Sequence, residues 1–147
     1  MEPTARKWHS HSHEPDTGPR GHIGQGTVVE SPFTCDYGYK VFLGDDVVIQ
    51  SGCHMQDPCE ISIGDRTIVG PNVKFYGISP SIDPSARSGG QGPVRGSAIR
   101  VEADCSIGGD VIILPFRKIG KGAVVGASSV VTKVSLYQQL SHLEPCA

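Results

Sequence analysis

A branched aliphatic residue recurs at every sixth position in the C-terminal third of this sequence. The series consists of Val101, Ile107, Ile113, Ile119, Val125 and Val131. An α-helix repeats about every 3.6 residues and an ordinary strand about every 2, so neither explains a period of six. A hexapeptide period is typical of a parallel β-helix, in which stacked coils bury a continuous aliphatic column that no single coil could bury alone.

Two other positions of the repeat are also restricted. Glycine follows several of the aliphatic residues, at Gly108, Gly120 and Gly126. We expect these glycines to supply the unusual backbone angle of a coil corner. Small side chains that fit a tight interior recur four residues after the aliphatic residue, at Cys105, Val111, Ala123 and Ser129. Leu114 interrupts the glycine column, and Arg117 interrupts the column of small residues.

The same period is present upstream in shorter series. These series are Ile23 and Val29; Leu43, Ile49 and Met55; and Ile63, Val69 and Phe75. Because the register shifts between them, we expect irregular corners near residues 30–40 and 56–61. A composition with 19 glycines and only 37% hydrophobic residues suits the narrow core of a prism better than a two-layer core.

Residues 77–97 depart from the repeat. This stretch is rich in Gly, Pro and Ser and lies between two regular blocks. Structureless loops longer than about 12–15 residues are uncommon and often functional, so we expect an excursion that protrudes from the prism wall. The predicted organisation is a disordered polar tail over residues 1–20, a β-helix over 21–134, and a short C-terminal helix or tail over 135–147.

Charge and cysteine content restrict the possible partners. The formal net charge is −2, which predicts no binding to nucleic acid or to a membrane surface. No apolar run approaches the roughly 18–20 residues that span a bilayer. Residues 1–20 lack the apolar region of a signal peptide, so we expect a cytoplasmic protein. The five cysteines include no CxxC pair, so a zinc or disulfide framework is not expected.

Several longer segments resemble a known enzyme family. They are PFTCDYGYKVFLGDD (32–46), ISIGDRTIVGPNVKFY (61–76), IDP (82–84), IILP (112–115) and VVGASSVVTK (124–133). Together they resemble the catalytic domain of maltose and galactoside O-acetyltransferases, in the same order. The resemblance implies an all-β, left-handed parallel β-helix with a protruding loop, a homotrimer with active sites between neighbouring prisms, and acetyl-CoA as co-substrate. It also implies that a loop histidine acts as general base on the acceptor hydroxyl, because imidazole titrates in the required range.

The resemblance also assigns residues to the two substrates. Asp36, Gln50 and Asp57 match positions at the acceptor pocket. The positions that meet coenzyme A in the family are matched by Gly109, Ala127, Thr132 and Lys133. Backbone amides and a lysine suit the phosphates and pantetheine amides of this cofactor. No metal is implied, because the γ-class carbonic anhydrases that share this fold need three zinc-binding histidines on adjacent coils, which this sequence does not offer.

Four positions depart from the family pattern. Pro80 occupies the position of the loop histidine, Gln50 that of an asparagine, Ser106 that of a tryptophan, and Phe116 that of a turn glycine. Proline has no ionisable group and cannot act as a base. His54 is a weaker candidate for that role, and because it neighbours Met55 in the repeat we expect it to point outward from the prism.

Two functions are compatible with these observations. The first is an acetyl-CoA-dependent O-acetyltransferase that acts on a sugar or another small hydroxyl compound, with turnover impaired by Pro80. The alternative is a non-catalytic trimeric scaffold or binding protein derived from the same family. A chain with ends altered by truncation or mis-splicing would keep the fold and lose part of the function.

Overall fold

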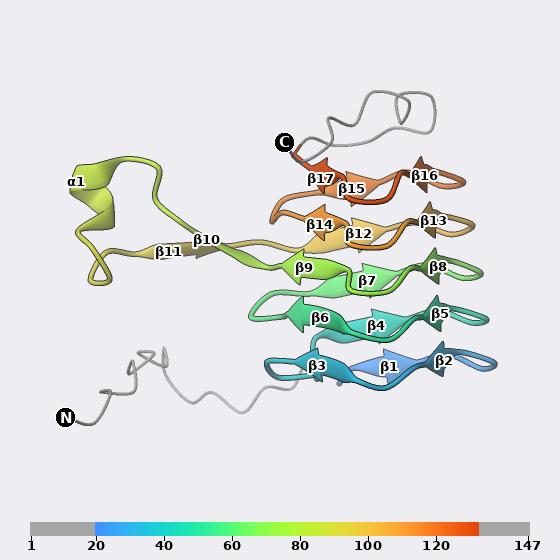
Figure 1. Ribbon diagram of the computed structural model, residues 1–147. Coiled ribbons are helices and arrows are strands. Elements are labelled where there is room, and N and C mark those ends of the chain that lie inside the picture. The colour runs from blue at the N-terminus through green and yellow to red at the C-terminus, as the bar shows by residue number, and fades with distance from the viewer. Residues whose placement is uncertain (1–19, 133–147) are drawn as a thin grey trace.

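The prism is built from three parallel sheets. The computed structural model describes residues 20–132, and within this range each sheet has five strands (Figure 1). Sheet A contains β1 (His22–Ile23), β4 (Val41–Leu43), β7 (Ile61–Ile63), β12 (Ile99–Val101) and β15 (Lys118–Ile119). Sheet B contains β2 (Val28–Val29), β5 (Val48–Ile49), β8 (Ile68–Val69), β13 (Ser106–Ile107) and β16 (Val124–Val125). Sheet C contains β3 (Phe33–Cys35), β6 (Cys53–Gln56), β9 (Lys74–Tyr76), β14 (Ile112–Ile113) and β17 (Val130–Val131).

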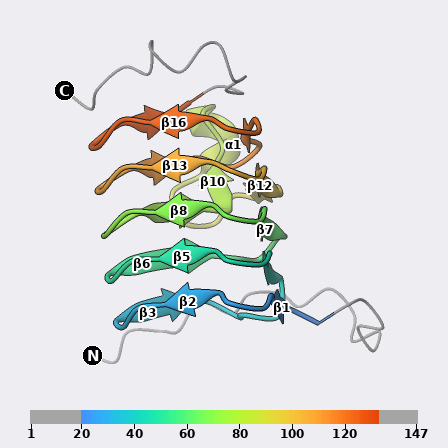
Figure 2. The ribbon, with the colours of Figure 1, turned by 90° about the vertical axis from the view of Figure 1, so that its right-hand side faces the viewer.

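Consecutive strands of the prism belong to different sheets, so the chain winds round once for every three strands. Figure 2 shows the strands of sheet B stacked one above another. This arrangement confirms the predicted all-β, left-handed parallel β-helix. The predicted tail before residue 20 and the predicted C-terminal helix over 135–147 lie outside the described residues. In the described part, no helix is long and apolar enough to cross a membrane.

The length of one coil differs along the prism. In the first coils, paired residues are 20 positions apart, as His22 pairs with Phe42 and Val41 pairs with Ile61. In the last coil, Ser106 pairs with Val124, which gives the 18 residues of three hexapeptides. The extra residues lie between β3 and β4 and between β6 and β7, which confirms the irregular corners predicted from the shifts in register.

The interior of the prism holds the predicted aliphatic column. The following members of the hexapeptide series are all buried: Leu43, Ile49, Met55, Ile63, Val69, Phe75, Val101, Ile107, Ile113, Ile119, Val125 and Val131. The predicted small residues beside them, from Cys105 to Ser129, are buried as well. Because burying one such side chain contributes about 1.5–3 kcal/mol, this column is the main source of stability.

The glycines of the repeat have a different role from the predicted one. The left-handed corner residues lie two positions further on, for example Asp104 (φ 59°), Asp110 (φ 58°) and Phe116 (φ 64°). At Gly108, an added Cβ would lie 2.5 Å from the backbone nitrogen of Ala127 in the next coil. The expectation of an unusual corner angle at Gly108 was therefore wrong, and its missing side chain instead lets two coils stack closely.

An arm leaves the prism between β9 and β12, as predicted for residues 77–97 (Figure 1). It consists of β10 (Ile78–Pro80) and β11 (Val94–Gly96), which pair antiparallel, with α1 (Pro84–Arg87) at the tip. The N–H of Ser97 donates a hydrogen bond of 3.1 Å to the carbonyl oxygen of Gly77. The arm therefore leaves and re-enters the prism at one point, and β9 and β14 remain in register across it.

Candidate active site

A groove of about 780 Å³ separates the arm from the prism. Its prism side consists of Gln56, Tyr76, Leu114, Pro115, Phe116 and Arg117. Its arm side consists of Ile78, Ser79, Pro80, Ser81, Ile82, Asp83 and Arg95. The prism residues come from the ends of strands in sheet C and from the corner that follows, so the groove lies where sheet C turns into sheet A.

The end of sheet C places one predicted cofactor residue, Thr132, in the same column as residues that line the groove. Gln56 pairs with Tyr76, and Leu114 and Thr132 follow the paired residues Ile113 and Val131. The register therefore places Thr132 directly beyond Leu114, which lines the groove. Lys133, the other predicted cofactor residue in this segment, lies outside the described residues.

Asp57, a predicted acceptor residue, is fully buried and holds a loop of the preceding coil. Its Oδ1 accepts hydrogen bonds from the backbone N–H groups of Asp36 (3.0 Å) and Tyr37 (2.9 Å). Its Oδ2 accepts one from the N–H of Gly38 (2.7 Å). Asp36, the other predicted carboxylate, lies in that loop and is exposed. The structure thus brings the two residues together, with Asp57 positioning the backbone that carries Asp36.

The remaining predicted residues lie on the opposite border of sheet C. Gln50, Gly109 and Ala127 each occupy the corner between sheet B and sheet C, in different coils. The N–H of Ser128 donates to the carbonyl oxygen of Gly109 at 2.8 Å, which stacks the last two of these corners. Strand β6 separates Gln50 from Asp57, so these two predicted acceptor residues lie at opposite ends of one strand.

His54 points outward from sheet C, as predicted. The Nδ1 atom of its imidazole lies 2.6 Å from the Oγ1 of Thr34, and its Nε2 lies 3.7 Å from a carboxylate oxygen of Asp36. His54 precedes Gln56 by two residues on β6, but only Gln56 lines the groove. The candidate replacement base therefore lies beside the groove.

Pro80 lies at the end of β10 and lines the groove on its arm side. Among the described residues that line the groove there is no histidine. Asp83 is the one carboxylate in this lining, and it accepts hydrogen bonds from the hydroxyl (2.8 Å) and the N–H (3.0 Å) of Ser85. These two bonds, the hydroxyl bond first, lower the pKa of Asp83 and make it a weak base.

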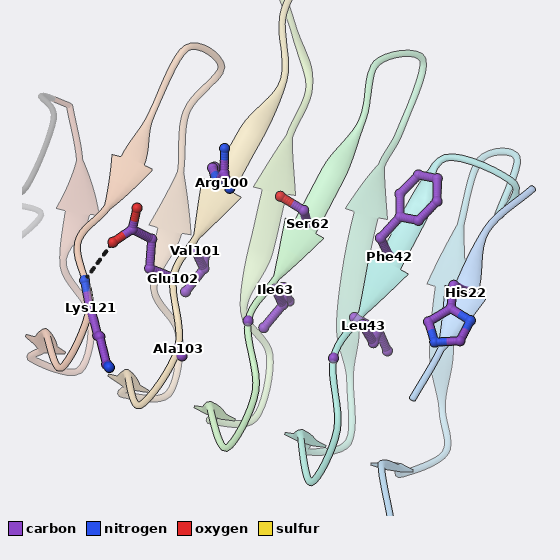
Figure 3. A pocket seen from close by; sticks show the side chains of 12 residues that line it. His22, Phe42, Leu43, Ser62, Ile63, Arg100, Val101, Glu102, Ala103 and Lys121 are labelled. Carbon is purple, nitrogen blue, oxygen red and sulfur yellow. Dashed lines mark hydrogen bonds between the residues drawn. The ribbon is translucent and has the colours of Figure 1, made fainter. Parts of the chain in front are cut away.

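A second, smaller depression of about 460 Å³ lies on the outer face of sheet A (Figure 3). Its polar side chains include Arg100 and Glu102. The Oε1 of Glu102 lies 3.0 Å from the Nζ of Lys118, and its Oε2 accepts from the N–H of Lys121 at 3.1 Å. These bonds lower the pKa of Glu102. None of the predicted site residues lines this depression.

The described residues contain no cluster of three or more His, Cys, Asp or Glu side chains that could hold a metal ion. Burial raises the pKa of the Cys53 and Cys105 thiols above the ordinary value, so neither is a ready thiolate ligand.

A prism of stacked hexapeptide coils, with an arm that forms a groove against one edge, defines the hexapeptide-repeat β-helix class of protein. The chain is 38% identical over 112 residues to nodulation protein L of Rhizobium meliloti, which covers 76% of this chain and 58% of that protein. It is 30% identical over 112 residues to the galactoside O-acetyltransferase of Lactococcus lactis, covering 76% of this chain and 53% of that protein. No protein-family model matches the chain.

Solved structures give the same result. A hexapeptide-repeat acetyltransferase of Vibrio cholerae complexed with acetyl coenzyme A matches with a TM-score of 0.75 and 35% identity, covering 80% of this chain and 63% of that one. A maltose O-acetyltransferase of Clostridium difficile matches with a TM-score of 0.73 and 38% identity, covering 78% of this chain and 60% of that one. The chain belongs to the hexapeptide-repeat acetyltransferase family. It spans about half to three-fifths of the length of the curated relatives it matches.

Proposed function

We propose that the chain transfers an acetyl group from acetyl-CoA to a hydroxyl of a sugar or another small compound in the cytoplasm. The observation that carries this proposal is the groove between the arm and sheet C, with Pro80 on one wall and Gln56 and Tyr76 on the other. A groove of this size admits a small acceptor. The Vibrio relative crystallised with acetyl coenzyme A supports the choice of donor.

We propose that both substrates lie along sheet C. Asp36 and the groove lie at its border with sheet A, and Gly109 and Ala127 lie at its border with sheet B. We propose that the cofactor runs past the Gly109 corner and that the acceptor occupies the groove. In the transfer, the hydroxyl oxygen bonds to the acetyl carbonyl carbon, the C–S bond breaks, and the hydroxyl proton ends on the sulfur of coenzyme A.

The weak point of this site is proton removal. Pro80 offers no base, and the carboxylate of Asp83 is weakened by its bonds to Ser85. Holding the two substrates together lowers the barrier even without a base, while a positioned base contributes a further factor of about 10²–10⁴. We therefore expect slow transfer by the unaltered chain.

Release of the coenzyme A thiol, followed with a thiol-reactive dye over a panel of sugars and small alcohols, tests the proposal. The Pro80→His variant restores an imidazole at an exposed position of the arm and should raise kcat by at least about tenfold. Ser81→His, one residue further along the arm, is the matched control. The proposal would be overturned if calorimetry detected acetyl-CoA binding to neither the unaltered chain nor the Pro80→His variant.

The alternative function is a binding protein or scaffold without turnover, and the specific observation that favours it is Pro80. In that case acetyl-CoA or an acceptor binds, but neither the unaltered chain nor Pro80→His releases thiol. Both functions would use a homotrimer. The outward face of sheet B supports this assembly, because Val28, Val48 and Ile68 pair along it and Val28 and Ile68 are exposed. A further exposed valine, Val124, follows beyond Ser106.

A further inference from the structure

Arg117 occupies a position that the fold reserves for an apolar side chain. Val41, Ile61 and Ile99 pair with one another across sheet A, and all three are buried. Arg100 pairs with Lys118, so the next position of this column, beyond Ile99, is Arg117. The backbone bond from the N–H of Arg100 to the carbonyl oxygen of Arg117, at 3.0 Å, fixes this placement.

Arg117 also lines the groove, so its side chain takes part in the groove wall as well as in the column. Its Nη1 donates to the carbonyl oxygen of Phe116 at 3.2 Å. Its Nε is buried and has no hydrogen-bond partner among residues 20–132. A buried donor on a permanent cation that lacks a partner is costly in free energy, and such groups mark a strained or functional position.

A second arginine lines the same groove from the other side. Arg95 lies on β11 in the arm and is exposed. The carboxylate of Asp83, also in the lining, is already engaged by Ser85. The groove lining therefore contains two arginines and one carboxylate, and that carboxylate already accepts hydrogen bonds from Ser85.

The rest of the groove wall strengthens the effect of these charges. Leu114, Pro115 and Phe116 form an apolar stretch next to Arg117. Apolar walls lower the local dielectric, so an ion pair formed there gains more than one on the open surface. Guanidinium groups match carboxylates and phosphates through paired hydrogen bonds.

We infer that the acceptor carries an anionic group, a carboxylate or a phosphate, that Arg117 and Arg95 bind in the groove. This inference rests on the proposed function and specifies its acceptor as a hydroxy acid, a sugar acid or a sugar phosphate. Arg117 is then a specificity-determining residue, and its presence in the apolar column is a cost to stability that serves binding.

Binding of glucose, glucuronate and glucose 6-phosphate to the full chain, measured by calorimetry, tests the inference. These sugars differ only at carbon 6, so the neutral sugar is a matched control for the anion. We expect either anionic sugar to bind at least about tenfold more tightly than glucose, since a charge-assisted pair contributes that much. Equal binding of the neutral and both anionic sugars would overturn the inference.

Two variants separate binding from folding. Arg117→Met keeps the length of the stem and should abolish the preference for the anion. Arg117→Val completes the column of Val41, Ile61 and Ile99, so it should raise the melting temperature by a few degrees while losing the same preference.

Two further variants test the other arginines near the groove. Arg95→Gln should weaken the preference for the anion severalfold. Arg87→Gln, a change of the same charge in α1 outside the groove lining, should leave it unchanged. A preference that survives in both Arg117 variants would contradict the assignment.

The phosphates of coenzyme A are another source of anions, and one further titration distinguishes them. If Arg117→Met weakens coenzyme A and leaves glucuronate unaffected, the two arginines serve the cofactor and the inference is wrong. Because sugar binding is measured without acetyl transfer, a chain that binds glucuronate but not acetyl-CoA would overturn the proposed function alone. Transfer to neutral sugars only would overturn this inference alone.

Discussion

Asp57 accepts a hydrogen bond of 2.7 Å from the backbone N–H of Gly38, one coil earlier in the prism. Together with the bonds from the N–H groups of Asp36 and Tyr37, this contact makes Asp57 the anchor of the loop between β3 and β4. The longer coils of the first half of the prism need such an anchor, because their extra residues leave backbone groups that no strand pairing satisfies.

Replacing Asp57 with alanine should destabilise the protein by about 2–4 kcal/mol, because the N–H groups of the loop lose a buried acceptor. Urea denaturation measures this change. Glu60→Ala, an exposed carboxylate in the same region, is the control and should shift the midpoint very little. Equal effects of the two substitutions would mean that the Asp57 carboxylate does not hold the loop.

Phe116 offers a stabilising substitution. Its φ of 64° is in the left-handed region, which costs a residue with a Cβ about 1–2 kcal/mol, and the residue is 54% exposed. Phe116→Gly should therefore raise stability by roughly 1 kcal/mol in the same denaturation assay.

Phe116→Ala isolates the cause, since alanine removes the ring but keeps the strained angle. We expect no gain from it. A gain from alanine as large as that from glycine would show that the exposed ring is the destabilising feature.

The prism could be predicted well from the sequence, because the period of six residues equals the spacing of the side chains that pack in its interior. Each residue from Leu43 to Val131 in the hexapeptide series faces a similar residue one coil away, so a single spacing predicts the burial of all of them. Phe116 was also located correctly as a turn position, and its left-handed φ confirms that a glycine would suit it.

The candidate site was predicted less completely, because it depends on contacts between distant residues. Asp57 is an acidic residue in the sequence, but its role as an acceptor for the loop at 36–38 follows only from the extra residues of that corner. Arg117 was visible as an interruption of a column. That this residue would line a groove depends on the position of the arm, which no hexapeptide spacing encodes.

His54→Gln should leave the transfer rate of the unaltered chain within about threefold. The imidazole lies beside the groove and faces Thr34 and Asp36, so it is not placed to take a proton from an acceptor. Gln56→Ala is the comparison, because Gln56 does line the groove and its loss should raise KM. A loss of tenfold or more in kcat for His54→Gln would make His54 the base of this site.

Ile68→Glu should convert the proposed homotrimer into a monomer. Ile68 is 48% exposed on the outward face of sheet B, where it pairs with Val48 on one side and Ser106 on the other. Val28 and Val124, at the two ends of this row, are exposed as well. A charge within an apolar interface cannot be solvated there. Light scattering coupled to size exclusion should give about three times the 15.6 kDa chain mass for the unaltered protein. His22→Glu, at an exposed outward-facing position of sheet A, should remain trimeric.

The hydrogen bond between Gly77 and Ser97 has a consequence for how such proteins diversify. Since the two ends of the arm meet at one point and the strands on either side keep their register, the arm is an insertion that does not alter the strand pairing of the prism. The length and composition of the arm can vary while the pairing between β9 and β14 continues unchanged. The arm wall of the groove can therefore change without disturbing the prism, whereas the wall that contains Arg117 belongs to the prism itself.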